Sequence, residues 1–297
     1  MGKELAAALP TARYVFEEVD EALEQRLSRL MFEGPEDELT LTANAQPALM
    51  AVSVAVMRVL ENDGGVELPT KAAYVAGHSL GEYSALCAAG ALSLSDTARL
   101  LRRRGEAMQA AVPVGVGAMA ALLGLSFDDA REVAEAAAGD DVCEPANDNA
   151  EGQVVVSGHR TAVERAVELA KERGGRRSIM LPVSAPFQCA LMQPAADVMA
   201  EALNGADMLA PAVPLVANVT ASAVEKPDEV VDLLVRQVTA MVRWRESVLF
   251  MKSQDVDNLV ELGVGKVLTG MLRRIDRELN GAAISTPEDI DQFLKAL

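Results

Sequence analysis

Residues 77–81 are Gly77-His78-Ser79-Leu80-Gly81, which fits the pattern G-x-S-x-G. The apolar run 72–76 precedes this pentapeptide and suits a buried strand, and a helical pattern follows it. Glycines let the backbone turn sharply between strand and helix, which exposes a serine hydroxyl at the helix N-terminus. The pattern therefore predicts that Ser79 is a nucleophile and that the backbone N–H of Leu80 faces a developing oxyanion. A tight turn with an incidental serine is the alternative.

Helices and strands alternate on either side of this turn. Helices are expected at 16–30, 47–60, 80–89 and 96–110, and later at 190–203, from 228 and from 266. Strands are expected at 215–217 and 258–261. Between these parts, strands at 116–123, 153–157 and 178–181 and helices near 126 and 161 indicate the order β-α-β-β-α-β, which is typical of a ferredoxin-like unit.

The fold class that this pattern predicts is α/β. We expect a parallel-sheet, hydrolase-like core formed by residues 1–111 and 187–297, which is discontinuous in the sequence. A small ferredoxin-like α+β subdomain, residues 112–186, is expected to be inserted into it.

Composition excludes several classes of protein. The 297 residues carry a formal net charge of -17, which argues against general nucleic-acid binding. No continuous run of 18 apolar residues and no signal-peptide pattern occurs, so no membrane association is expected. Cys87, Cys143 and Cys189 lack metal-type spacing, and such sparse cysteines suit a reducing cytoplasm. We expect a cytoplasmic monomer without a bound metal.

The longer string Gly77-His78-Ser79-Leu80-Gly81-Glu82-Tyr83-Ser84-Ala85-Leu86 resembles the malonyl-CoA:acyl carrier protein transacylase family. Five further stretches agree, in order and over almost the whole chain. They are Ala45-Gln46-Pro47-Ala48-Leu49, Arg104-Gly105, Ala146-Asn147-Asp148-Asn149, Leu181-Pro182-Val183-Ser184-Ala185-Pro186 and Glu261-Leu262-Gly263-Val264-Gly265-Lys266-Val267-Leu268. The inserted small domain is also what this resemblance implies.

The resemblance implies a ping-pong acyltransferase of fatty-acid or polyketide synthesis. Ser79 would take malonyl from malonyl-CoA and pass it to the phosphopantetheine thiol of acyl carrier protein. Coenzyme A enters as a thioester substrate, and no metal or redox cofactor is implied. Arg104 matches the family arginine that binds the malonyl carboxylate, and a guanidinium can grip a carboxylate with two parallel hydrogen bonds. Spacing alone also fits a solvated basic run, Arg102-Arg103-Arg104.

Other positions are candidates for the site, by family match or by spacing, and each has an ordinary alternative. Phe187 would line the acyl pocket and limit space beside the α-carbon, or be a core phenylalanine. Met108, one helical turn after Arg104, would line the same pocket or pack. Gln46, Asn147 and Asn149 would be polar site residues, helix caps or turn residues.

Gln188 departs from the family, which has its catalytic histidine at this position. A glutamine amide is not a general base near neutral pH, and loss of the base typically costs about a thousandfold in rate. His78 and His159 are the two histidines of the chain. We expect His78 to pack at the turn rather than replace the base, and His159 to lie at a helix start or on the surface.

The family also begins with a strand and a Gly-Gln-Gly-Ser loop that supplies an oxyanion donor. Those residues would precede Met1, so we expect one strand and one donor fewer. A second function stays open, a catalytically silent homologue that binds acyl carrier protein or traps an acyl group. A general serine hydrolase is disfavoured, because Arg104 has no purpose there and no candidate histidine follows the serine late in the chain. Carrier proteins are acidic, so a local basic patch should dock them, either Arg173, Arg176 and Arg177 or Arg102 and Arg103.

Overall fold

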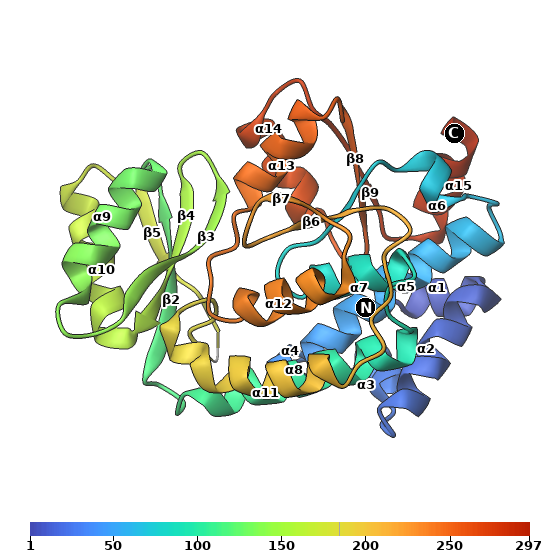
Figure 1. The fold of residues 1–297 in the computed structure, drawn as a ribbon, viewed down its shortest axis with the longest axis horizontal. Coiled ribbons are helices and arrows are strands. Elements are labelled where there is room, and N and C mark those ends of the chain that lie inside the picture. The colour runs from blue at the N-terminus through green and yellow to red at the C-terminus, as the bar shows by residue number, and fades with distance from the viewer. Residues whose placement is uncertain (184) are drawn as a thin grey trace.

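The structure is a computed structural model that describes residues 1–183 and 185–297 (Figure 1). Ser184, part of one family stretch, lies outside the described residues. The chain begins with α1 (Lys3–Ala8), α2 (Pro10–Ala22), α3 (Leu27–Glu33), α4 (Glu36–Thr40), α5 (Thr42–Asn62), α6 (Leu68–Lys71), β1 (Val75–Ala76), α7 (Gly81–Ala88) and α8 (Leu94–Ala111). It continues with β2 (Gly117–Leu123), α9 (Phe127–Ala138), β3 (Cys143–Ala150), β4 (Gln153–His159), α10 (Arg160–Glu172) and β5 (Arg177–Met180).

The last third of the chain returns to the side of the molecule where the first third lies (Figure 1). Its elements are the short 3-10 helix η1 (Ala190–Met192), α11 (Gln193–Asn204), β6 (Leu215–Ala217), β7 (Ser222–Val224), α12 (Pro227–Gln237), α13 (Trp244–Ser253), β8 (Asn258–Leu262), α14 (Val267–Ile275), β9 (Asn280–Ile284) and α15 (Pro287–Ala296). The predicted α/β fold class with an inserted unit is confirmed.

The strands of this larger part are short. β1 pairs parallel with β6, so that Val75 lies opposite Leu215, and β7 adds an antiparallel edge to them. β8 and β9 form a second, separate parallel pair. Of the expected strand 72–76 only Val75–Ala76 is paired. The turn that carries Ser79 therefore starts from a strand of two residues.

A four-stranded antiparallel sheet forms the inserted unit. Its order is β3-β4-β2-β5, with β2 between β4 and β5. The expected order β-α-β-β-α-β is confirmed. Its second strand, for which the sequence pattern predicted no residue range, is β3. Helices α9 and α10 cover one face of this sheet (Figure 1), where alanines and valines of both helices pack on Ala120, Leu122, Val154 and Val156.

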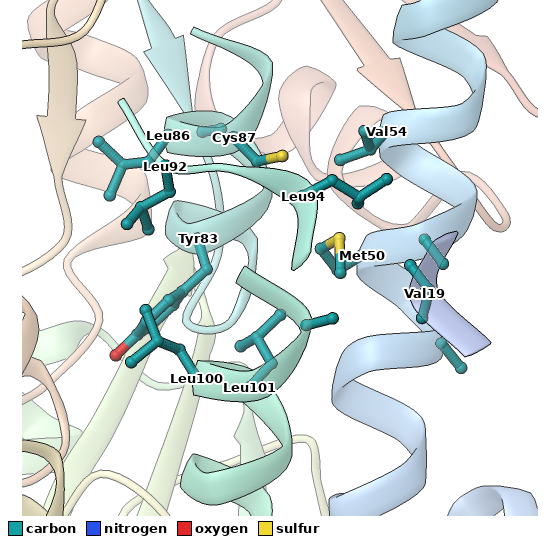
Figure 2. Packing of buried hydrophobic residues seen from close by; sticks show 14 of the residues in the cluster. Val19, Met50, Val54, Tyr83, Leu86, Cys87, Leu92, Leu94, Leu100 and Leu101 are labelled. Carbon is teal, nitrogen blue, oxygen red and sulfur yellow. The ribbon is translucent and has the colours of Figure 1, made fainter. Parts of the chain in front are cut away.

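Helix α5 is the centre of the main hydrophobic core. Figure 2 shows Met50 and Val54 of α5 on the side of that helix where Leu94 of α8 lies, and Val19 of α2 and Leu101 of α8 belong to the same buried cluster. By length and composition α5 could cross a membrane, the one such helix among the described residues, yet 67% of the relevant window is buried inside the protein. With aromatics at 3% of the sequence, this core is built from Ala, Val, Leu and Met.

The helix expected at 16–30 is corrected to two helices, α2 and α3. Glu24 has φ 49°, a left-handed conformation that interrupts the helix between them. The carboxylate of Asp20 accepts the N–H of Ser28 at 2.7 Å and the Ser28 hydroxyl at 2.5 Å. These bonds hold the start of α3, which is why the continuous apolar pattern does not give one long helix.

Candidate functional site

Ser79 lies in the turn between β1 and α7, as its pentapeptide predicts. A Cβ on Gly77 would lie 2.0 Å from the carbonyl carbon of Gly81, so only glycine fits there. Ser79 has φ 52°, a strained conformation for a residue with a side chain. Leu80 follows as the residue before α7, with φ -55° and ψ -25°, so its N–H belongs to the free donors of that helix end.

The Ser79 hydroxyl receives two hydrogen bonds. Gln188 Nε2 donates to Ser79 Oγ at 2.7 Å, and Arg104 Nη2 donates to the same oxygen at 3.0 Å. Gln188 is buried and, like Ser79, has φ 52°. A guanidinium accepts no hydrogen bond and an amide is no base near neutral pH, so neither neighbour takes up the hydroxyl proton.

Arg104 is buried, with an exposed fraction of 1%. Its Nη1 donates to Gln46 Oε1 at 2.7 Å, and its Nη2 also donates to Gln237 Oε1 at 2.8 Å. The adjacent Gly105 allows this approach, because a Cβ there would lie 2.6 Å from Ala43 Cα at the start of α5. All three acceptors of Arg104, the Ser79 hydroxyl included, are neutral, and its buried Nε has no partner among the described residues. The charge is therefore free to bind a carboxylate.

The two preceding arginines point elsewhere. Arg102 donates to Asn44 Oδ1 at 2.8 Å and to the side-chain oxygen of Gln25. Arg103 pairs with Glu201 at 2.9 Å on the surface. Of the run 102–104, only Arg104 therefore reaches Ser79.

Three polar residues surround the other side of the turn that carries Ser79: Glu82, Asn218 and Gln237. The sequence did not indicate that Asn218 and Gln237 belong to the site. Asn218 Oδ1 accepts the backbone N–H of Ser79 at 2.8 Å, and Asn218 Nδ2 donates to Gly77 O at 2.8 Å. Glu82 accepts the backbone N–H of Asn218 at 2.5 Å and a hydrogen bond from Gln237 Nε2. Burial raises the pKa of Glu82 to about 8, although these two donors and the Arg104 charge lower it. Asn218 follows β6 directly, a position at the end of a strand that could have indicated it.

His78 turns away from the serine hydroxyl. Its Nε2 lies 2.8 Å from Asn149 Oδ1, and its ring centroid lies 5.8 Å from that of Trp244. Burial lowers its pKa, so the ring is neutral near pH 7. Among the described residues no hydrogen bond joins His78 to Ser79 Oγ. His159, at the end of β4, accepts the N–H of Val142 at 2.9 Å within the inserted unit.

The remaining predicted site residues lie around this centre. Met108 is buried, with Sδ 3.7 Å from Gln46 Nε2. Phe187 is half-buried and packs against both the main core and a small cluster that contains Met119 and Val155. Asn147 is buried, and within the described part of the chain its Nδ2 has no partner. Their expected roles in the acyl pocket stay predictions.

Main-chain bonds join β3 to the larger part of the molecule beside Asn147. Asp148 N donates to Val242 O at 3.0 Å, and Val242 N donates to Ala146 O at 2.9 Å. The Asp148 carboxylate is buried and is gripped by Arg245, whose Nε lies 3.1 and 3.0 Å from the two oxygens. This seam fixes Asn147 and Asn149 relative to the serine turn.

Titration of Glu82 should make stability depend on pH. The folded protein keeps the Glu82 proton up to about pH 8, whereas the unfolded chain releases it near its ordinary value of 4.5. Between these values the folded state binds more protons, so the free energy of unfolding falls as pH rises, by up to about 1.4 kcal/mol per pH unit. Glu82→Gln should remove this contribution to the pH dependence of the free energy of unfolding. Urea unfolding at pH 5, 6.5 and 8 checks the result, and parallel profiles for the two proteins would contradict it.

Comparison with known proteins gives one consistent family. The family described as "Acyl transferase domain" matches residues 1–283. The chain is 43% identical over 298 aligned residues to the malonyl CoA-acyl carrier protein transacylase of Bacillus subtilis (strain 168), with 100% of this chain and 92% of that protein covered. It is 45% identical over 284 residues to the same-named protein of Escherichia coli (strain K12), with 96% and 91% covered.

Solved structures agree with this result. The crystal structure of an acyl-carrier-protein-S-malonyltransferase from Bartonella henselae is 55% identical, with a TM-score of 0.97 over 100% of this chain and 94% of that one. A malonyl-transacylase solved in complex with its type II PKS acyl-carrier protein is 40% identical, with a TM-score of 0.96 over 100% and 95% of the two chains.

Proposed function

Because this chain belongs to the malonyl CoA-acyl carrier protein transacylase family, we propose that it moves malonyl from malonyl-CoA to the phosphopantetheine thiol of acyl carrier protein through an ester on Ser79. The observation that carries the proposal is the meeting of Arg104 Nη2 and Ser79 Oγ at 3.0 Å. Malonyl carries its free carboxylate two carbons from the reacting carbonyl. An acyl group on Ser79 would therefore place that carboxylate beside the buried guanidinium.

The proposed chemistry has two balanced steps and uses no metal or redox cofactor. Ser79 Oγ attacks the thioester carbonyl, the C–S bond breaks, and coenzyme A leaves as the thiol with the serine proton. The carrier thiol then attacks the ester carbonyl, the C–O bond to Ser79 breaks, and the thiol proton returns to the serine. The N–H of Leu80 would stabilise the oxyanion in both steps.

Gln188 makes the first step slow. Two donors hold Ser79 Oγ, and no base among the described residues accepts its proton, so the serine is a weak nucleophile. The thiol of the second step is more acidic than a serine hydroxyl and attacks as a thiolate with less help. The second candidate function, a silent homologue that binds carrier protein or retains the acyl group, follows from the same two bonds.

Intact mass after mixing with malonyl-CoA tests the proposal. We expect a malonyl mass to appear on the native protein, to be absent from Ser79→Ala, and to disappear when carrier protein with a free phosphopantetheine thiol is added. A label that forms but does not transfer would identify an acyl trap. No label after hours of incubation would exclude the transferase.

Docking of the acidic carrier should use exposed arginines at one end of the inserted unit. Arg102, Arg103 and Arg173 are engaged by Gln25, Glu201 and Glu132. Arg176 and Arg177 are exposed, and their side chains form no hydrogen bond or ion pair with any described residue. Arg274 of α14 donates to Gln153 Oε1 at 3.1 Å, at the turn where Gly124 N bonds Gly152 O and where Arg176 packs against Gly124. We propose Arg176, Arg177 and Arg274 as the docking patch.

Charge reversal tests this patch. The double variant R176E/R177E should lower kcat/KM for carrier protein about tenfold at low salt and leave labelling by malonyl-CoA unchanged. Added salt should slow the native protein more than the variant. Arg29→Glu, which breaks a surface pair with Glu33 elsewhere, is the control. A native rate that does not fall with salt would count against the patch.

We also propose a monomer in the cytoplasm. The three cysteines are buried free thiols, which suits a reducing compartment.

A further inference from the structure

Glu82 is a buried carboxylate next to the nucleophile that the proposed chemistry does not use. An acid in the first turn of a helix is ordinary on a surface, where it faces the free N–H groups or water. Glu82 has an exposed fraction of 1% and instead reaches two distant segments. One oxygen accepts Asn218 N at 2.5 Å and the other accepts Gln237 Nε2. Its partners lie after β6 and at the end of α12.

The side-chain amide of Gln237 has only one workable orientation. Its Nε2 faces an oxygen of Glu82 and lies 2.9 Å from the carbonyl oxygen of Ser79. The Ser79 carbonyl only accepts, and so does the ionised carboxylate that Glu82 carries above its pKa of about 8. Its Oε1 faces Arg104 Nη2 at 2.8 Å, and a guanidinium only donates. Gln237 has an exposed fraction of 0%, so no water replaces a lost bond cheaply. When ionised, Glu82 therefore acts together with the Ser79 carbonyl to determine which end of this amide Arg104 meets.

Arg104 depends on that amide for its direction. Its Nη2 is shared between Gln237 Oε1 and Ser79 Oγ, while Nη1 is held by Gln46. If Gln237 were turned over, its NH2 group would face Nη2, and two donors in contact would push the guanidinium away from Ser79. The chain of contacts runs from Glu82 through Gln237 to Arg104.

We propose that Glu82 is a positioning residue for acyl-group selection: by fixing the Gln237 amide it keeps Arg104 aimed at Ser79, and so favours acyl groups that carry a second carboxylate. This inference deepens the proposed function and rests on it. Glu82 also supports the serine turn through Asn218, whose Oδ1 holds Ser79 N. The selection of the acyl group and the geometry of the Ser79 turn therefore both depend on Glu82.

Glu82→Gln is the sharpest test because it keeps the size of the side chain. Its amide oxygen can still accept Asn218 N, but its NH2 then faces the NH2 of Gln237. Relief of that contact requires Gln237 to turn over, which sets its NH2 against Arg104. The matched control is Asp96→Asn, a partly exposed acid in the first turn of α8.

The readout is binding of free malonate and acetate to the intact protein by calorimetry at pH 9. This pH lies above the pKa of Glu82, and both ligands are fully ionised there. We expect the ratio of the acetate to the malonate dissociation constant to fall at least tenfold in Glu82→Gln and to be unchanged in Asp96→Asn. A ratio equal to that of the native protein would overturn the inference. If Glu82→Gln does not fold, Gln237→Met, which leaves the Glu82–Asn218 bond intact, should show the same loss.

Labelling separates this inference from the proposed function. If native protein is never labelled by malonyl-CoA but the malonate preference falls in Glu82→Gln, the transferase proposal fails and the positioning role stands. If native protein is labelled and Glu82→Gln keeps its preference for malonyl-CoA over acetyl-CoA, the positioning role fails and the transferase stands. A native protein that binds malonate no better than acetate would overturn both.

Discussion

Gln188→His should raise the rate of malonyl transfer by about a thousandfold, the factor that a general base typically contributes to a serine nucleophile. Gln188 Nε2 already lies 2.7 Å from Ser79 Oγ, so a ring nitrogen of histidine could reach the same oxygen. The imidazole would accept the serine proton in the first step and return it to the leaving thiol. Single-turnover labelling of Ser79 by malonyl-CoA, followed by rapid quench, measures the gain.

The pH dependence should change together with the rate. Among the described residues of the native chain no base contacts Ser79 Oγ, so we expect hydroxide or solvent to remove the serine proton and the logarithm of the rate to rise with a slope of about one per pH unit. In Gln188→His the rate should level off above about pH 6.5, the ordinary pKa of histidine. Gln188→Leu removes the donor without adding a base and should stay within about tenfold of native. Equal rates for the histidine and leucine variants would contradict the argument.

Arg104→Met should lower malonyl transfer about a hundredfold more than acetyl transfer. A charged hydrogen bond of a guanidinium to a carboxylate is worth about 1.5–3 kcal/mol, and only malonyl brings that carboxylate. Competition between malonyl-CoA and acetyl-CoA for labelling of Ser79 gives the ratio directly. Arg104→Lys keeps the charge but loses the planar fork, so it should restore only part of the preference.

Loss of Arg104 also leaves Gln46 Oε1 and Gln237 Oε1 without this donor, so a folding check must accompany the assay. Arg102→Met is the matched control, since Arg102 bonds Asn44 and Gln25 instead of the serine. In Arg102→Met the rates of malonyl transfer and of acetyl transfer should change by the same factor, if they change. Equal losses of malonyl and acetyl transfer in Arg104→Met would exclude the carboxylate role.

Sequence reasoning succeeded where a local signal exists. The serine turn is marked by Gly77, whose missing side chain the close contact with Gly81 requires. The order of the inserted unit is marked by strand and helix periods and by short turns. Both signals act within a few residues of the element they predict, so one sequence is enough to see them.

The sequence could not reveal what long-range contacts decide. Glu82 lies 136 residues from Asn218 and 155 from Gln237, and no pattern in the sequence joins them. The choice among Arg102, Arg103 and Arg104 was left open by spacing, and it is made by the packing of Gly105 against the start of α5. The break after α2 was missed because Asp20 hydrogen-bonds Ser28, a local polar contact inside an apolar period.

The contact between the rings of His78 and Trp244 makes Trp244 an intrinsic fluorescent probe of the site. Trp244 is the single tryptophan of the chain, and it is buried. Its ring lies 5.8 Å from that of His78, which precedes Ser79, and it precedes Arg245, which holds Asp148 of β3. We therefore expect its emission to respond both to the turn that carries Ser79 and to the contacts between Asp148 of β3 and Arg245. Acyl loading and loosening of these contacts can be followed by intrinsic fluorescence, without any attached dye.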